Sequence, residues 1–145
     1  MRENFQRALA FTLKWEGGYT NDPNDPGGET NFGVNKRDHP NEDIKGMTKE
    51  RAGEIYLEEY WIPAGCDEVI SPDDAALFDS AVNCGVYRTK KWYWQTGCYS
   101  LLLRLREQYY INLAERRPKL KIYLNGWLNR VHALERQCRE WEVMG

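Results

Sequence analysis

Apolar side chains recur at intervals of three and four near the start of the chain, which predicts a helix over residues 4–15. Gly17-Gly18 follows directly, and glycine commonly ends a helix. Because Glu16 is the next position on the apolar stripe, we expect its carboxyl group at the border of a hydrophobic face. The stripe itself consists of Phe5, Leu9, Thr12 and Leu13.

The longest periodic pattern lies at the other end of the chain, over residues 120–141. Its apolar positions alternate in steps of three and four, which predicts one long amphipathic helix with its stripe in the core. Arg130 falls within this helix, and we expect it to pair with an acidic residue. The stripe consists of Leu120, Leu124, Trp127, Val131, Leu134, Cys138 and Trp141.

Helix-starting and helix-ending residues divide the middle of the chain. Thr48 is a suitable N-cap for a helix that continues to about residue 61. Ser71-Pro72, followed by two acidic residues, predicts a second N-cap and first turn, for a helix that ends at Gly85. A further helix is expected to end before Pro118, because proline does not continue a helix.

The segment after the first helix has a different composition. Every residue over 21–28 favours turns, which predicts an ordered loop, and residues 29–34 suffice for a small hairpin. The pattern as a whole predicts a mainly α fold with a minor β-hairpin. The length of 145 residues suits one domain spanning 1–145.

Charge is divided unevenly along the chain, although the net charge is only −2. Residues 1–85 carry 8 basic and 17 acidic side chains, whereas residues 86–145 carry 12 basic and 5 acidic ones. A basic half can meet an anionic partner such as a cell envelope or a nucleic acid. Basic residues on solvated helix faces would explain the same numbers. Since the sequence contains no recognisable nucleic-acid motif, we expect no nucleic-acid partner.

The four cysteines are widely spaced and form no C-x-x-C pair, and neither histidine lies near them in sequence. This spacing argues against zinc, and a calcium loop beginning at Asp22 would need a ligand where Gly33 stands. We therefore predict no metal and no cofactor. We expect reduced, buried thiols, with disulfides as the alternative if the protein works outside the cell. The cysteines are Cys66, Cys84, Cys98 and Cys138.

The first residues form a mixed amphipathic stretch without the apolar core of a secretory signal peptide. No apolar run approaches the roughly 18 residues that a membrane span requires. We therefore expect synthesis in the cytoplasm and no stable membrane insertion. A substrate outside the membrane would then require a separate export route.

Two carboxylates near the start of the chain suit cleavage of a glycosidic bond. Burial of Glu16 beside the apolar stripe would raise its pKa and keep a proton available for the leaving oxygen. Asp25 lies nine residues on, in a glycine-containing loop that could return towards Glu16, and glycosidases use paired carboxylates. Thr30 could hold a water molecule. The alternatives are a solvated Glu16, and Asx-turns formed by Asp22 and Asp25.

Several motifs are distributed along the chain. E-G-G-Y at residues 16–19 precedes N-D-P-N-D-P-G-G-E-T at 21–30. Downstream, Y-x-x-x-Y-W spans 56–61, F-D-S-A-V-N-C-G spans 78–85, and G-W-L-N-R-V spans 126–131. Together they resemble the signature of glycoside hydrolase family 108, the bacterial and phage N-acetylmuramidases of the lysozyme-like superfamily. The resemblance covers nearly the whole chain.

This resemblance implies a lysozyme-like fold and hydrolysis of the bond between N-acetylmuramic acid and N-acetylglucosamine in peptidoglycan. It also implies that Glu16, in E-G-G-Y, is the catalytic acid. Glu16, Asp25 and Thr30 are similar to the E…D…T arrangement of phage lysozymes, although the threonine there is one residue further along. The substrate-binding residues that we expect are Tyr19, Tyr60, Asp79 and Asn83.

Asp79 and Asn83 are four residues apart, so both point to one face of their helix. The resemblance implies that this face borders the substrate cleft, where Asn83 could form a hydrogen bond with a sugar acetamide. The alternative for Asn83 is a helix cap before Gly85.

Residues 87–105 depart from the family pattern, because the stretch is shorter and lacks a D-G-x-x-G turn. Substrate binding there would be weaker or differently built. The alternative function is a non-catalytic peptidoglycan-binding or secretion-assisting protein. For the enzyme, we expect a monomer that acts on peptidoglycan in the periplasm or cell wall, exported through a holin-type pore as in phage lysis.

Overall fold

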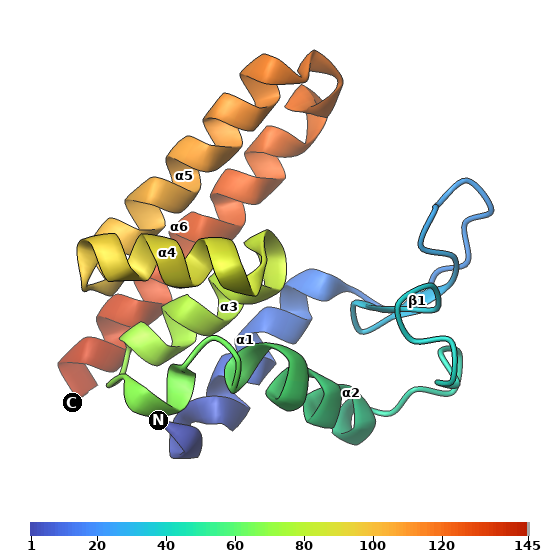
Figure 1. Ribbon diagram of the computed structural model, residues 1–145, viewed down its shortest axis with the longest axis horizontal. Coiled ribbons are helices and arrows are strands. Elements are labelled where there is room, and N and C mark those ends of the chain that lie inside the picture. The colour runs from blue at the N-terminus through green and yellow to red at the C-terminus, as the bar shows by residue number, and fades with distance from the viewer. Residues whose placement is uncertain (145) are drawn as a thin grey trace.

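The computed structural model describes residues 1–144, most of which are helical (Figure 1). The helices are α1 (Phe5–Glu16), α2 (Lys49–Tyr56), α3 (Asp73–Cys84), α4 (Val86–Thr96), α5 (Tyr99–Arg116) and α6 (Lys121–Met144). Short helical turns extend or connect them: η1 (Arg2–Asn4), η2 (Leu57–Trp61), η3 (Cys66–Glu68) and η4 (Pro118–Leu120). Two short strands, β1 (Thr30–Asn31) and β2 (Val34–Asn35), complete the fold.

The predicted small hairpin is present. β1 and β2 are antiparallel, with Thr30 opposite Asn35. Phe32 and Gly33 form the turn, and both have positive φ angles, of 52° and 78°, as in type I′ hairpin turns. Thr20 pairs with Thr30 and so closes the loop that precedes the hairpin. Figure 1 shows this loop and hairpin on one side of the molecule, apart from the layered helices.

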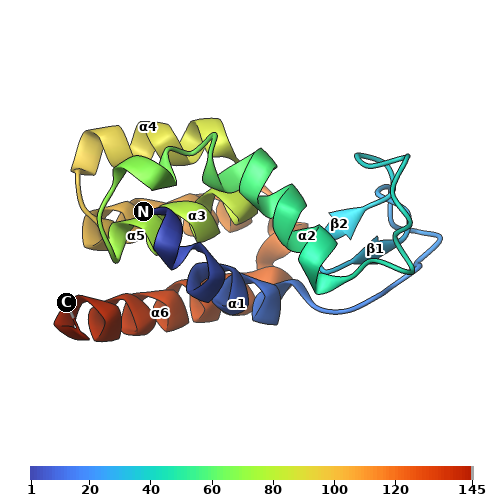
Figure 2. The ribbon, with the colours of Figure 1, turned by 90° about the horizontal axis from the view of Figure 1, so that it is seen from below.

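The centre of the helical part is α3, most of whose residues are buried. Figure 2 shows it between α4 on one side and α1 and α6 on the other. Phe78 on α3 packs edge-on against Phe5 of α1 and Trp61 of η2, with ring centres 5.6 and 5.5 Å apart. This aromatic packing joins α1, η2 and α3 in the core.

The predicted helix from Thr48 to about residue 61 is confirmed, with one difference at its end. The hydroxyl of Thr48 accepts a hydrogen bond from the backbone N–H of Arg51 at 3.1 Å, as an N-cap does. The final turn, η2, is π-helical, and the N–H of Ile62 donates to the carbonyl of Leu57 at 3.0 Å.

Ser71 does not cap α3, so the prediction of its start is wrong. The helix begins at Asp73, and Pro72 occupies the N-cap position without a side-chain cap. The hydroxyl of Ser71 instead accepts a hydrogen bond from the guanidinium of Arg7 on α1. The Ser71 hydroxyl therefore makes a tertiary contact with α1 instead of capping α3.

Both C-terminal predictions are confirmed, since α5 ends before Pro118 and α6 is one long helix. α4 has no counterpart among the predicted elements. Gly97 separates it from α5 in the left-handed conformation (φ 72°) that glycine adopts without strain. α5 and α6 then form an antiparallel pair that projects from the other helices (Figure 1).

All four cysteines are free, and three of them, Cys66, Cys84 and Cys138, are buried. Within residues 1–144, no helix combines the length and the apolar character needed to cross a membrane.

Candidate active site

Glu16 is the last residue of α1, and Gly17 ends the helix directly behind it with a φ of 75°. The Glu16 side chain is 20% exposed, so its carboxyl group is neither fully solvated nor fully enclosed. Glu16 Oε1 lies 3.0 Å from Nη1 of Arg130 on α6. Because an anion at a helix C-terminus is unfavourable, this arginine compensates for the position of the glutamate.

A buried chain of alternating charges holds Arg130 in place. Asp79 on α3, with a side chain only 1% exposed, accepts hydrogen bonds from Arg130 Nη2 at 2.8 Å and Arg106 Nη1 at 2.9 Å. Thr12 on α1 donates a further hydrogen bond to Asp79 at 2.7 Å. Two acids and two arginines therefore alternate from Glu16 to Arg106. The prediction that Arg130 pairs with an acid is confirmed.

The electrostatic consequence is clearest at Asp79. Burial alone would raise the pKa of its carboxyl, but the guanidinium groups of Arg130 and Arg106 outweigh burial and lower the pKa to about 2. Burial likewise acts to lower the pKa of Arg130, and the Asp79 carboxylate more than offsets it. Both groups are therefore charged across the physiological pH range.

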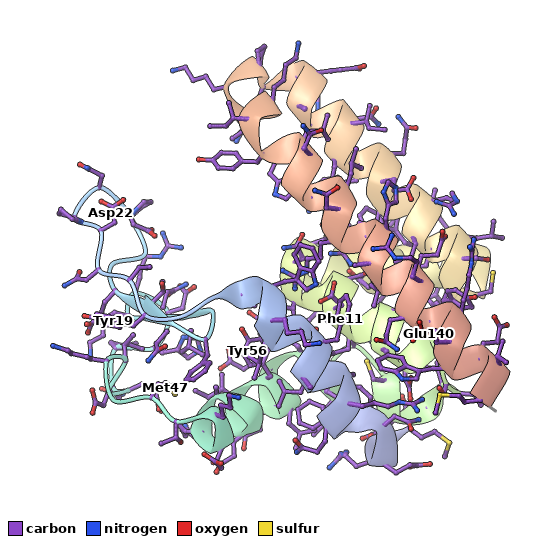
Figure 3. All side chains as sticks on the ribbon, turned by 180° about the vertical axis from the view of Figure 1, so that it is seen from behind. Phe11, Tyr19, Asp22, Met47, Tyr56 and Glu140 are labelled. Carbon is purple, nitrogen blue, oxygen red and sulfur yellow. The ribbon has the colours of Figure 1, made fainter. Side chains whose placement is uncertain are left out.

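The turn of the hairpin packs directly against the Glu16 carboxyl group. A Cβ atom at Gly33 would lie 3.0 Å from Glu16 Oε2 and would overlap the hydroxyl of Tyr56. That hydroxyl donates a hydrogen bond to the carbonyl of Phe32 at 2.6 Å. Figure 3 shows Tyr56 between α1 and the hairpin side of the molecule. Glycine is therefore required at position 33 both by its conformation and by its neighbours.

Tyr60 lies beside this group, with its ring centre 5.6 Å from that of Tyr56. Burial raises the pKa of Tyr60, and the nearby carboxylates of Glu59 and Glu16 raise it further. The structure thus places Tyr60, an expected substrate-binding residue, within electrostatic reach of Glu16. Tyr56 contacts the site more closely, but the sequence indicated it only as part of the Y-x-x-x-Y-W motif and not as a site residue.

The other residues expected near Glu16 lie on the loop and hairpin and bond to their own neighbours. Asp25 Oδ1 accepts a hydrogen bond from the N–H of Gly27 at 2.8 Å, which is the Asx-turn alternative. The hydroxyl of Thr30 lies 2.8 Å from that of Thr20. No hydrogen bond or ion pair found among residues 1–144 joins Asp25 or Thr30 to Glu16.

Two further loop residues bond in the same local way. Asp22 forms the expected Asx-turn with the N–H of Asn24 at 2.9 Å. Tyr19, which is 38% exposed, donates a hydrogen bond from its hydroxyl to Glu29 at 2.7 Å. Tyr19 therefore presents a ring to solvent, as a sugar-binding residue must.

Asp79 does not face a cleft, which corrects the expectation for this residue. Its carboxylate is enclosed and fully engaged by Arg106, Arg130 and Thr12, so it offers no oxygen to a sugar. The expectation fails because the residues that bury Asp79 come from other helices. Asn83, four residues on, is exposed, and its side-chain oxygen accepts a hydrogen bond from Tyr110.

An apolar groove of about 950 Å³ opens beside α1, between it and α2. Its lining includes Leu13, Gly17 and Phe32 but not Glu16, so the groove adjoins the candidate site without containing it. Within residues 1–144, no cluster of three or more His, Cys, Asp or Glu side chains could hold a metal ion.

The chain is similar to known proteins in sequence and in fold. The solved structure of Brucella abortus SagA matches it with a TM-score of 0.76 and 21% identity, and the match covers 97% of each chain. This likeness, together with the helices and hairpin described above, confirms the mainly α, lysozyme-like fold. No curated protein matches the chain. The family model for glycosyl hydrolase 108 matches residues 9–85, which is more than half of the sequence and includes Glu16, Gly33, Tyr56 and Asp79. The chain therefore belongs to glycosyl hydrolase family 108.

Proposed function

We propose that the protein is a peptidoglycan hydrolase, an N-acetylmuramidase that cleaves the glycosidic bond between N-acetylmuramic acid and N-acetylglucosamine with Glu16 as general acid. The observation that carries this proposal is the placement of Glu16. It is a partly exposed carboxyl group at the end of α1, against the hairpin turn, and it is paired with a buried arginine. Membership of a glycosidase family supports the reaction class.

A general acid must hold its proton while the rest of the site stays in place. Arg130 is bound to Asp79 through both Nε and Nη2, at distances from 2.8 to 3.3 Å. This second partner keeps Arg130 in position when Glu16 is protonated. Protonated Glu16 then donates to the oxygen of the leaving sugar as the bond to the anomeric carbon breaks.

A water molecule completes the proposed reaction by adding to the anomeric carbon from the opposite face. We propose Asp25 as the base or electrostatic partner that receives or balances the water proton, and Thr30 as the group that orients the water. Both residues lie on the loop and hairpin rather than on α1, and a wide separation between carboxylates favours inversion.

Loss of turbidity of purified cell walls tests the role of Glu16. In a Glu16→Gln variant the amide keeps the size of the side chain but cannot deliver a proton, so we expect the rate to fall about 10²–10⁴-fold. Glu115→Gln is a matched control, because Glu115 is exposed on α5 and makes no ion pair with any residue of 1–144. Retention of more than about a tenth of the activity by Glu16→Gln would assign the acid elsewhere, with Glu29 the next candidate.

Two product analyses test the finer parts of the proposal. Muramidase action requires N-acetylmuramic acid at the new reducing ends, and N-acetylglucosamine there would refute the bond assignment. Inversion requires the α anomer before mutarotation, whereas a β product means retention. An Asp25→Ala variant with full activity would remove the support for a role of Asp25, whichever anomer forms.

A further inference from the structure

α4 exposes two aromatic side chains almost completely. Tyr87 is 82% exposed and Trp94 is 86% exposed, whereas tryptophan is on average a largely buried residue. The two are seven residues apart, which is nearly two full turns, so they lie on the same face of the helix about 10 Å apart along its axis. Isolated exposed apolar residues are common on proteins, but two aligned aromatic rings form a defined surface to which a ligand can bind.

The space between these aromatic side chains is positively charged. Lys90 and Lys91 lie between them along the helix, both are exposed, and neither forms an ion pair with any residue of 1–144. α4 contains no acidic residue. We call the surface formed by Tyr87, Lys90, Lys91 and Trp94 the α4 face.

Shallow hollows flank the α4 face on both sides. One, of about 610 Å³, is lined by Tyr87 and Lys91 together with the end of α3. The other, of about 440 Å³, is lined by Lys90 and Trp94 together with Glu68, which is its one acidic lining residue. The aromatic and basic groups therefore border depressions in which a flexible chain could lie.

The opposite side of α4 is firmly attached to the protein. Thr89 is buried, the ring of Trp92 packs edge-on against Tyr109 at 5.5 Å, and Tyr93 donates a hydrogen bond to Asp73 at 2.5 Å. Figure 2 shows α4 as the outer helix, across α3 from α1 and α6. The backbone of α4 is therefore held in place, and the α4 face is presented to solvent. A ligand can bind there without having to order the helix first.

We propose that the α4 face binds a peptidoglycan glycan strand outside the candidate active site, an inference that rests on the proposed function for its choice of ligand. Pyranose rings present flat C–H surfaces that pack on aromatic rings, and the two aromatics are far enough apart to contact different, non-adjacent sugars of one strand. The stem peptides of peptidoglycan carry carboxylates, which complement Lys90 and Lys91. The face thus matches the strand in both shape and charge.

A membrane surface is the competing ligand for a face of aromatic and basic residues. Binding at a bilayer interface depends on apolar area that enters the acyl boundary. Val86, the one aliphatic residue of α4, is half-buried, and the apolar residues that α4 exposes are the two aromatics. The composition of the face therefore favours a glycan over a lipid surface.

A second attachment point would act through local concentration. A strand held on the α4 face stays near Glu16 between cleavage events, and linked binding sites commonly raise overall avidity by about 10²–10⁴-fold. The effect applies only to substrates long enough to contact both places. Altering the α4 face should therefore reduce activity on intact walls but not on short soluble fragments.

Co-sedimentation with purified sacculi tests this inference, in a Glu16→Gln background so that the sacculi are not digested. Removing both aromatic rings with Tyr87→Ala and Trp94→Ala should weaken binding at least about tenfold, since each exposed anchor is of the type that dominates interfaces. Lys90→Gln with Lys91→Gln should remove most of the salt dependence of binding.

Matched controls come from exposed residues elsewhere. Ile122→Ala with Tyr123→Ala removes two exposed apolar side chains of α6, and Lys119→Gln with Lys121→Gln removes two exposed charges. Both should bind sacculi as the parent does. In the otherwise wild-type protein, the aromatic double variant should lose activity on intact walls but keep it on a soluble muramyl tetrasaccharide.

Three outcomes would overturn the inference. They are sedimentation of the aromatic double variant like the parent, an equal loss of binding by the controls, and binding of the face to phosphatidylglycerol vesicles in place of sacculi. Failure of the proposed catalytic function is distinguishable from these. Sacculus binding that depends on the α4 face without any wall cleavage would refute only the enzyme, whereas cleavage with unaltered binding would refute only the α4 face.

Discussion

Replacing Asp79 by asparagine removes one negative charge from the buried chain that runs from Glu16 to Arg106. The amide keeps the size of the side chain and can still accept the hydrogen bond from Thr12. It leaves Arg106 without an anionic partner and Arg130 with Glu16 alone. The variant therefore isolates the electrostatic contribution of Asp79 from its packing.

The expected loss of folding stability in Asp79→Asn follows from the structure in two ways. Lowering of the Asp79 pKa from 3.8 to about 2 corresponds to about 2–3 kcal/mol of stability at neutral pH. Removing one partner of a buried ion pair typically costs about 3–5 kcal/mol, because the other charge stays buried without compensation. We expect a loss of about 3–5 kcal/mol, which for a chain of this length lowers Tm by roughly 10–15 °C.

Urea denaturation of wild type and Asp79→Asn, repeated between pH 7 and pH 3, measures this contribution. Folding lowers the pKa of Asp79, so its contribution is complete above the unfolded value of 3.8 and is lost as the pH falls towards about 2. The difference in unfolding free energy between the two proteins should therefore narrow at the acidic end of the range.

Asp67→Asn provides a matched control. The Arg2 guanidinium also holds the pKa of Asp67 at about 2, but the Asp67 side chain is 31% exposed, and exposed pairs contribute about 1 kcal/mol or less. If Asp79→Asn cost no more than Asp67→Asn at pH 7, or if its cost did not change with pH, the reasoning about the buried chain would be refuted.

Two further predictions concern the hairpin turn and the thiols. Gly33→Ala should cost about 1–2 kcal/mol for the positive φ and should also abolish wall lysis, because its Cβ meets Glu16 and Tyr56. Gly97→Ala has a similar φ of 72° but nothing within 4 Å, so it should lose stability and keep activity; equal activity in the two variants would contradict the prediction. Only Cys98 should react rapidly with a thiol reagent such as Ellman's in the native protein, because burial raises the pKa of Cys66, Cys84 and Cys138. Four fast-reacting thiols before denaturant is added would show that the core opens readily.

The elements that the sequence predicts correctly are those determined by local pattern. The apolar stripes of α1 and α6 and the N-cap at Thr48 depend on residues within a few positions of one another, and all are present. Ser71 fails as a cap because Arg7, from a distant part of the sequence, bonds its hydroxyl. Local rules cannot include such a competitor.

The same distinction applies to the candidate site. Glu16 is identified by its position on the stripe of α1 and by the E-G-G-Y motif, both of which are local. The burial of Asp79 depends on arginines 27 and 51 residues further along the chain. The sequence did contain a signal for this burial, because Asp79 lies within the mostly apolar run of residues 75–82. A polar residue within such a run commonly has a buried hydrogen-bonding partner.

The buried chain of charges also changes what counts as the functional unit of this protein. The family model matches residues 9–85, which contain both carboxylates of that chain, Glu16 and Asp79. Both arginines that neutralise them come from α5 and α6, so part of the opposite charge of the two halves is cancelled inside the molecule. A fragment that ends at Gly85 would contain the whole matched segment and Glu16, the proposed proton donor, yet neither Glu16 nor Asp79 would have its arginine partner. The candidate site is therefore assembled from both halves of the chain, and the matched segment alone lacks the two arginines of the buried charge chain.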